Sequence, residues 1–355
     1  MSNPSPSKTI GGKQLAFITY MQVIGIILVV VGHSMHEYPD NDMGRTTLLY
    51  RMIYSFHMPL FLFVSGFLMV YGMELKAKAV SWRNFVTSKL RRLMVPFVVL
   101  TAVTFFPRAM MSGMADDTVT LSVESFRDSF IYTGSLVIPY FWFLQVCFTL
   151  LIVNFTILYI ARRLNLPDLP VYAALLLIFL ITPFAPIGTT NTFSLHLTVE
   201  NGLYFVIGAI YARYYPHINR LFPRNSAIAF AGCAALWAGL FALTENTPLF
   251  PLCTLAGITM CISSSKLLDS HDIRILDHLS GANYIIFLLS WYFNIAAQQI
   301  LHHFIELPWW VYSTLSLLTG IYIPYLIYRH LRSHPENRIS RLAAILLGQR
   351  FSKRA

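Results

Sequence analysis

Two histidines lie in apolar surroundings where an imidazole can carry out chemistry. His33 ends the run GIILVVVG and is followed at once by His36, Glu37 and Asp40, and His57 lies within IYSFHMPLFLFVSGF. A neutral imidazole, whose pKa is about 6.5, is suited to removing a proton from a hydroxyl group. The sequence therefore predicts a general base, although His33 alone could also be an ordinary histidine at a membrane interface.

The position of His57 favours function more strongly. If its segment is one helix that enters the membrane from outside, His57 lies about ten residues along it, roughly 15 Å deep. Ionisable groups at such depth usually face a cavity or a partner. Pro59 would loosen the helix beside it.

One acidic residue is a candidate partner for these imidazoles. Glu200, in TVENGLYFVIG, lies near the outer end of a predicted span. Its carboxylate could orient an imidazole or bind the hydroxyls of an acceptor. The alternative is a helix-cap residue just outside the bilayer.

A basic cluster lies at the opposite end of a span. The segment SKLRRLMVPF places Lys89 and Arg92 three residues apart, on one face of a predicted helix, with Arg91 between them. Basic side chains here could anchor the helix at the interface. They could also bind phosphate, because guanidinium groups form paired hydrogen bonds with it.

Composition indicates that membrane-spanning helices position these residues. The chain has 355 residues, of which 56% are hydrophobic and 12% are charged. Soluble domains carry about 25% charged residues, so this chain is expected to be an all-α membrane protein. Spans need about twenty apolar residues, and ten segments qualify: about 15–34, 48–72, 93–107, 138–161, 170–186, 197–212, 226–243, 248–264, 282–301 and 308–328.

The distribution of basic residues predicts the orientation. With both termini in the cytoplasm, 22 of the 26 Lys and Arg residues fall in interior segments, as the positive-inside rule requires. The net charge of +10 is then an orientation signal, and no basic motif with interleaved aromatic residues indicates nucleic acid.

No linker or repeat divides the chain, so we expect one membrane-embedded domain over residues 1–355. Residues 1–14 would form a cytoplasmic N-terminus, and 330–355 a basic tail on the inner membrane surface. The outer loop, about 108–137, could form a short amphipathic lid.

Other polar residues and the cysteines have structural interpretations. We expect hydrogen bonds between helices from Gln145, Asn154, Asn283 and Asn294. The four cysteines, Cys147, Cys233, Cys253 and Cys261, lie in apolar runs without CxxC spacing and are expected to be packing residues, so we predict no metal site.

Four motifs in order resemble those of the acyltransferase-3 family of membrane acyltransferases, especially its sugar O-acetylase-like branch. The first helix of that family carries a basic residue, ten intervening residues and a histidine, here YMQVIGIILVVVGHS. The others are HMPLFLFVSGF, KLRRLMVP before the third span, and the WFL element of YFWFLQVCF. The family also has ten spans with interior termini.

The resemblance assigns roles residue by residue. It implies that His33 is the catalytic histidine and that Lys89 and Arg92 bind acyl-CoA, while His57, Ser65 and Gly66 shape the pocket. Three features depart from the family pattern. Gln22 replaces the basic residue of the first helix, Lys89 replaces the first Arg, and the ninth span has Ser290 and Trp291 where relatives often have a Leu-His pair.

The resemblance also implies a mechanism. Acyl-CoA, with acetyl as the default acyl group, would be a donor substrate and not a bound cofactor. Its phosphates would lie at the inner face on Lys89, Arg91 and Arg92, and its thioester would extend toward the histidines. The acceptor would be a sugar, a lipid-linked glycan or a surface polysaccharide, at the cell membrane, the inner one in a bacterium.

Two other classes stay open from the residues alone. A secondary transporter or flippase would also use intramembrane His and Glu, but the chain shows no paired interrupted helices. A non-catalytic scaffold would leave His57 unexplained.

Overall fold

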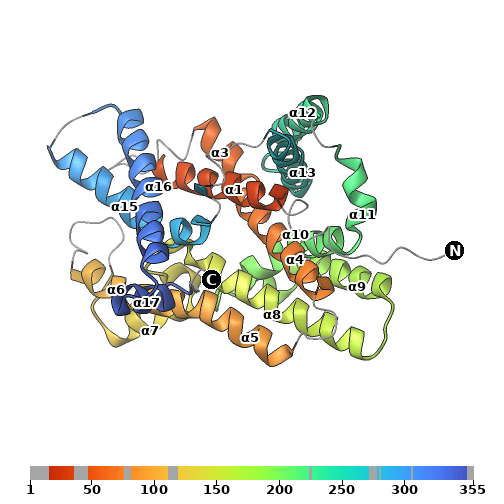
Figure 1. Cartoon of the computed structure of the whole chain (residues 1–355), viewed down its shortest axis with the longest axis horizontal. Coiled ribbons are helices and arrows are strands. Elements are labelled where there is room, and N and C mark those ends of the chain that lie inside the picture. The colour runs from red at the N-terminus through yellow and green to blue at the C-terminus, as the bar shows by residue number, and fades with distance from the viewer. Residues whose placement is uncertain are drawn as a thin grey trace. The chain divides into compact units, whose positions relative to one another are not determined.

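The computed structural model describes residues 16–35, 47–75, 81–110, 119–223, 226–271, 278–279, 281–304 and 307–349. Across these residues the chain is helical and has no strand (Figure 1). A single antiparallel bridge within the same residues pairs Tyr132 with Thr192. The prediction of an all-α polytopic membrane protein is confirmed.

The long helices occupy the ten predicted spans in order. They are α1 (Ala16–Ser34); α3 (Leu48–Tyr54) with α4 (His57–Leu75); α5 (Trp82–Lys89), the π-helical turn η1 (Leu90–Met94) and α6 (Val95–Met110); α8 (Trp142–Arg163); α9 (Asp168–Ile181); α10 (Leu195–Arg213); α12 (Ala227–Thr244); α13 (Phe250–Asp269); α15 (Asn283–Phe304); and α16 (Trp309–Ser333). Shorter elements are α7 (Val123–Ile131), α11 (Tyr215–Ile218), α17 (Arg338–Leu346) and the 3-10 turns η3 (Thr133–Ser135), η4 (Pro139–Phe141), η5 (Thr182–Phe184), η6 (Pro186–Thr189) and η7 (Asn219–Leu221).

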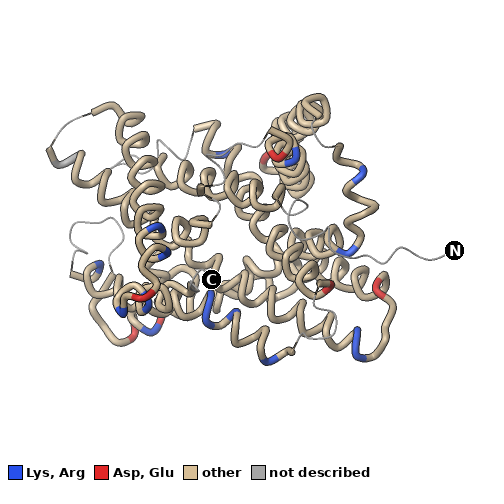
Figure 2. The backbone as a smooth tube through the Cα atoms, in the orientation of Figure 1, with Lys and Arg blue, Asp and Glu red and all other residues tan. Residues whose placement is uncertain are grey.

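Length and hydropathy identify the helices that could span a membrane. Among the described residues, 8 are long and apolar enough. The segment Asp168–Phe184 is apolar but shorter, and α10 is not among the 8. The count of ten and the cytoplasmic placement of both termini therefore remain predictions. Figure 2 shows that Lys and Arg gather near helix ends, and α8, α10 and α16 each have basic residues in the last turn.

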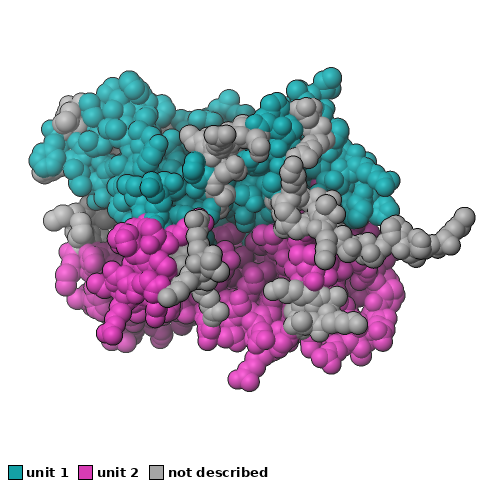
Figure 3. Space-filling model, in the orientation of Figure 1, with its two compact units in different colours: residues 1–64, 215–329 teal, residues 65–214, 330–355 magenta. Residues whose placement is uncertain are grey.

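The chain forms two compact units, which Figure 3 shows in different colours. Unit 1 comprises residues 1–64 and 215–329, and unit 2 comprises 65–214 and 330–355. Two of the boundaries fall inside α4 and α16. Each unit contains segments from both halves of the sequence. The expectation of a single domain over 1–355 is not tested by this division.

A close helix contact organises unit 2. A side chain at Gly66 on α4 would collide with the backbone carbonyl of Phe205 on α10 and would lie 3.2 Å from the Ala209 nitrogen. Only a residue without a Cβ lets the two backbones approach this closely. Gly66 therefore sets the spacing of α4 and α10, beside Ser65.

The outer segment of unit 2 is a helix docked on its neighbour. In α7, Phe126 packs edge to face against Phe105 of α6, with ring centroids 5.0 Å apart. Its first turn is capped by Ser122, whose hydroxyl accepts from the Ser125 amide at 3.0 Å. The loop predicted over 108–137 thus contains the expected short helix, while a function as a lid remains a prediction.

Candidate active site

A break in the second predicted span positions His57. The chain leaves the helix at Ser55 and Phe56, so His57 is the first residue of α4. His57 is nevertheless the tenth residue of the apolar segment Leu48–Leu75, as the sequence predicts, although the helix is interrupted just before it. Pro59 has no amide hydrogen to donate to the Ser55 carbonyl four residues before it, so the helix is interrupted at this point, in agreement with the disturbance expected from Pro59.

Two helices of unit 1 hold this break. Thr254 of α13 donates its hydroxyl to the Ser55 carbonyl at 2.7 Å, and Trp237 of α12 donates its indole N–H to the Ser55 hydroxyl at 3.2 Å. These bonds satisfy polar groups that the interrupted helix leaves without partners. The backbone preceding His57 is therefore fixed from outside its own helix.

The His57 ring is buried and oriented. Only 2% of the residue is exposed. Its Nδ1 lies 2.9 Å from the Ile53 carbonyl, which can only accept, so Nδ1 carries the proton. In the neutral ring the lone pair is then on Nε2, the atom that can act as a base. Tyr54 packs edge-on against the ring, with centroids 4.5 Å apart.

His33 lies in the last turn of α1, one residue before its end, and is half-buried. The preceding Gly32 packs against the Tyr54 ring, where a Cβ would come within 2.8 Å of Cε2. Tyr54 therefore packs against both the turn that carries His33 and the ring of His57. The neighbours His36, Glu37 and Asp40 lie outside the described residues.

A buried polar network fixes the end of α1. Gln298 of α15 donates Nε2 to the Ser34 carbonyl at 3.0 Å and to the Ser316 hydroxyl of α16 at 3.3 Å. Ser316 donates to the Asn294 carbonyl at 3.2 Å, and the Asn294 amide, in its satisfied orientation, donates to Ser316 and Ser290 carbonyls. Asn294 thus bonds between helices as predicted. Gln298 was not predicted, because only the fold brings position 298 to Ser34.

The basic cluster lies on a π-helical turn. Lys89 ends α5, while Arg91 and Arg92 lie in η1, where the Val95 amide bonds back to Leu90. Lys89 and Arg92 therefore do not share one face of an α-helix as expected. π-turns widen a helix locally and are frequent at functional sites. Lys89 is half-buried, and both arginines are exposed.

Three predicted donor-binding residues lie together in unit 2. The Cys147 thiol of α8 donates to the Ser65 hydroxyl of α4 at 3.7 Å. The elements that carry Lys89 and Arg92, α5 and η1, pack against the same helix α8. Cys147 thus contacts Ser65 on a helix that the basic elements also contact, whereas the sequence interpretation treated this cysteine only as packing.

Aromatic contacts hold α5 against α8. The Phe85 ring stacks on Phe155 with centroids 3.7 Å apart, and the Lys89 ammonium lies 5.1 Å from the Phe85 centroid. Trp82 donates its indole N–H to the Thr156 hydroxyl at 2.9 Å. Lys89 therefore lies beside an aromatic wall, which restricts the side chain.

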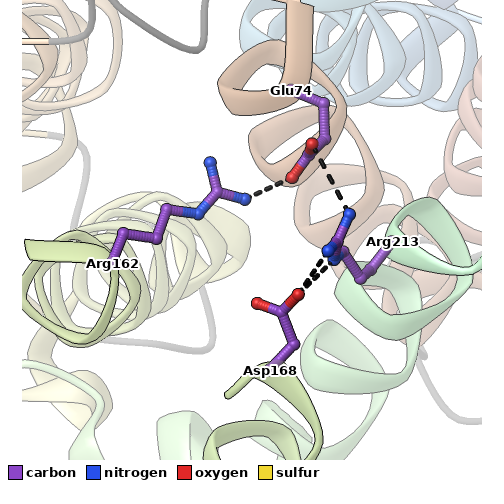
Figure 4. Close-up of polar contacts among 4 residues, drawn as sticks. All are labelled: Glu74, Arg162, Asp168 and Arg213. Carbon is purple, nitrogen blue, oxygen red and sulfur yellow. Dashed lines mark hydrogen bonds and ion pairs between the residues drawn. The ribbon is translucent and has the colours of Figure 1, made fainter. Parts of the chain in front are cut away.

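Four charged side chains at helix ends form a separate network (Figure 4). Glu74 lies near the C-terminal end of α4, and its carboxylate pairs with Arg162 of α8. Arg213 of α10 lies between Glu74, at 3.6 Å, and Asp168 of α9. Two positive and two negative charges meet, so Arg162 and Arg213 are matched by carboxylates of the same unit. Because the four positions are far apart in sequence, the network was not predicted.

A second network lies at the other end of α8. Gln145 donates to the Phe130 carbonyl at 3.1 Å and accepts from the Ser194 hydroxyl at 2.6 Å. Its predicted role as a bond between elements is confirmed. The predictions for Asn154 and Asn283 are not met. The Asn154 amide donates to Leu150 of its own helix, and among the residues that the structure describes neither side-chain polar atom of Asn283 has a partner.

Two further predicted residues stand apart from these groups. Glu200 is exposed in α10 of unit 2, and the residue that precedes this helix is Ser194, so the helix-cap alternative is wrong. Gln22 is half-buried in α1 of unit 1. Their predicted functional roles are not tested.

The predicted site residues thus fall into two groups, one within each unit. His33 and His57 lie in unit 1, and Ser65, Lys89 and Arg92 lie in unit 2. The first group offers a neutral imidazole base. The second offers two cations, together with the half-buried Ser65 hydroxyl and the buried Cys147 thiol.

Comparison with protein families gives one match, an acyltransferase domain over residues 15–329. No curated protein and no solved structure matches the chain. The matched region covers nearly the whole chain and includes His33, His57 and the η1 turn, and it supports an enzyme over a transporter or a scaffold. The chain therefore belongs to the acyltransferase-3 family of membrane acyltransferases.

Proposed function

We propose that this membrane acyltransferase moves an acetyl group from cytoplasmic acetyl-CoA to a hydroxyl of an extracytoplasmic or lipid-linked sugar. The observation that carries the proposal is that α5 and η1, which carry Lys89 and Arg92, pack against α8, where Cys147 bonds to Ser65 of α4. CoA is an elongated donor with phosphates at one end and a thioester at the other. A site for it needs cations at its entrance and an uncharged passage beyond them.

The η1 turn is the best candidate for the phosphate end. Arg91 and Arg92 are exposed, so their guanidinium groups can receive phosphate oxygens in paired hydrogen bonds. Arg162 and Arg213 have the same charge, but carboxylates of Asp168 and Glu74 already bind them. The exposure of both η1 arginines therefore supports η1 as the phosphate end.

Ser65 and Cys147 support the placement of the pantetheine arm. Their side chains are small, weakly polar and uncharged, and they join α4 to α8, the helix on which α5 and η1 pack. A narrow chain with amide groups can pass such residues without leaving a charge buried. We therefore place the arm between α4 and α8, next to Ser65.

The imidazoles would supply the base. In His57 the proton on Nδ1 is held by Ile53, so Nε2 is available to accept a proton. The sugar oxygen attacks the thioester carbonyl, the carbon–sulfur bond breaks, and the hydroxyl proton passes through the imidazole to the departing CoA thiolate. His33 would act directly on the hydroxyl, with His57 beside the same path, and Glu200 would bind acceptor hydroxyls.

Transfer from radiolabelled acetyl-CoA by the purified protein in lipid nanodiscs tests the proposal. Replacing Lys89 and Arg92 together by Gln should raise the donor KM at least about tenfold, since each charged hydrogen bond contributes about 1.5–3 kcal/mol. Lys89→Arg should keep or lower the donor KM, because it restores a planar fork. Arg162→Gln is the matched control and should leave the donor KM unchanged.

The acceptor is best identified in cells. Mass spectrometry of surface glycans with and without the gene should reveal an acetyl group that depends on this protein. A donor KM that the double substitution does not change, with both termini still at their original side, would contradict the proposed phosphate site.

A further inference from the structure

The C-terminal tail ends in a short, well-capped helix. Asn337 precedes α17, and its side-chain oxygen accepts from the Ile339 amide at 2.9 Å. At the other end Gly348 has a φ of +66°, the Gly348 amide bonds to Ile345 at 3.0 Å, and the Gln349 amide bonds to Ala344 at 2.7 Å. These two bonds form a Schellman motif. The helix therefore has a defined end at Gly348.

One face of α17 is buried in unit 2, and the opposite face is apolar and exposed. The buried face carries Ser340, Ala344 and Leu347. The exposed stripe carries Ile339, Leu342 and Ile345, at 76%, 58% and 55% exposure, and the exposed Arg338 and Arg341 lie along its edge. Apolar side chains edged by arginine are typical of a helix that lies in a membrane interface and binds anionic lipid.

The end of this helix contacts the turn that carries the basic cluster. α17 packs against α6 (Figure 1), which follows η1 directly. At Gly348 a Cβ would come within 2.5 Å of the Arg92 carbonyl oxygen and 3.0 Å of its Cα. The tail thus packs directly on the backbone of the π-helical turn.

We propose that α17 binds anionic lipid headgroups of the inner leaflet and, through Gly348, holds η1 in the geometry that binds the acyl-CoA donor. This inference rests on the proposed function, because it concerns the same donor site. Gly348 and α17 are positioning elements and do not touch the substrate themselves. Without lipid bound to α17, the η1 backbone would sample geometries in which Arg91 and Arg92 no longer converge on phosphate.

The experiment uses the full-length protein in two kinds of nanodisc, one of phosphatidylcholine and one that also contains phosphatidylglycerol. Binding of acetyl-CoA should be at least about fivefold tighter with the anionic lipid. Basic residues near an anionic surface are attracted to it, so this lipid should hold α17, and through it η1, in the binding geometry. The double substitution Arg338→Gln with Arg341→Gln should remove that dependence. The turnover number at saturating donor should change little, because the chemistry lies elsewhere.

Gly348→Ala tests the contact itself. A Cβ there meets the Arg92 backbone and also strains a positive φ, so donor binding should weaken in both bilayers. Gly72→Ala is the matched control in unit 2, because a Cβ at Gly72 meets nothing within 4 Å. Hydrogen exchange of the amides over 88–95 provides a readout independent of activity and should be faster in Gly348→Ala than in Gly72→Ala.

The outcomes separate the inference from the proposed function. If the wild-type protein binds acetyl-CoA equally in both bilayers, and neither variant alters donor binding or exchange in η1, the coupling is refuted while the function stands. If the wild-type protein binds no acetyl-CoA in either bilayer, the donor site itself is refuted, and the coupling with it.

Discussion

The thiol of Cys147 donates to the hydroxyl of Ser65 across 3.7 Å and joins α4 to α8, the helix on which α5 and η1 pack with Lys89 and Arg92. The family resemblance pointed to Ser65 but gave no role to Cys147. The cysteine therefore provides a natural reporter inside the proposed donor site.

Donor binding should protect Cys147 from modification. With methyl methanethiosulfonate, a small thiol reagent, we expect the modification of Cys147 to slow at least about threefold in saturating acetyl-CoA, because the pantetheine arm would cover it. Peptide mass spectrometry reads each cysteine separately, without substitutions. Cys233 of α12, half-buried in unit 1, is the internal control and should react at an unchanged rate. Equal protection of both residues would mean general tightening of the protein instead of occupancy at Ser65.

The tautomer of His57 indicates a substitution that separates proton transfer from folding. Because Nδ1 donates to Ile53, Asn can replace that donor but has no atom at the Nε2 position, whereas Gln reaches that position and loses the donor. If Nε2 takes part in proton transfer, His57→Asn should fold normally and lose about 100-fold or more in kcat. Thermal unfolding and transfer rates are measured together. An Asn variant with more than a tenth of wild-type activity would restrict His57 to packing.

His33 should be needed for chemistry and dispensable for folding. It is half-buried at the end of α1, whose position depends on the bond from Gln298 to Ser34. His33→Ala should therefore insert normally and reduce kcat by about 10²–10⁴-fold, the contribution of a general base. Gln298→Ala serves as a comparison, because it should lower the melting temperature first. The assignment fails if His33→Ala transfers acetyl groups at a rate near wild type.

Helix positions followed from the sequence because hydrophobic length is a local property. Each of the ten apolar segments coincides with a helix, and the motif residues His33 and Lys89 lie near the ends of those helices as expected. The exact positions of the interruptions did not follow. Pro59 indicates a disturbed helix near Ser55, but the bonds from Thr254 and Trp237 that stabilise the break come from distant parts of the chain.

The sequence predicted which residue types form the candidate site, but it predicted little of their geometry. Pro96 was a local signal that the helix near Arg92 is disturbed, but a π-turn and an α-helix share the same composition. Glu74, Arg162, Asp168 and Arg213 entered only a count of charges, because pairing depends on which helix ends meet. The contact of Gly348 with Arg92 joins positions 256 residues apart, beyond any pattern of spacing.

The ion network should stabilise unit 2 modestly and unequally. Arg213 contacts both carboxylates, with Nε donating to Asp168 at 2.6 Å, while Arg162 contacts Glu74 alone. About a third of each side chain is exposed, so solvent screening limits each pair to about 0.5–1 kcal/mol. Arg213→Gln should therefore lower the melting temperature more than Arg162→Gln. The difference should shrink in 1 M salt, and a salt-independent difference would indicate packing of the arginine stem.

Gly66 and Gly72, six residues apart on α4, should respond oppositely to the same substitution. At Gly66 a Cβ would collide with the Phe205 carbonyl and crowd the Ala209 nitrogen, and neither backbone can move without separating α4 from α10. Gly66→Ala should therefore cost about 1–3 kcal/mol of stability through overpacking. At Gly72 a Cβ meets nothing within 4 Å, so Ala should be neutral or stabilise the helix by up to about 1 kcal/mol.

Thermal unfolding in the same detergent compares the two variants, and the donor KM adds a functional readout. Because Ser65 precedes Gly66, a shift of α4 should also weaken donor binding in Gly66→Ala and leave it intact in Gly72→Ala. Equal melting temperatures for the two variants would show that α4 and α10 do not depend on this contact.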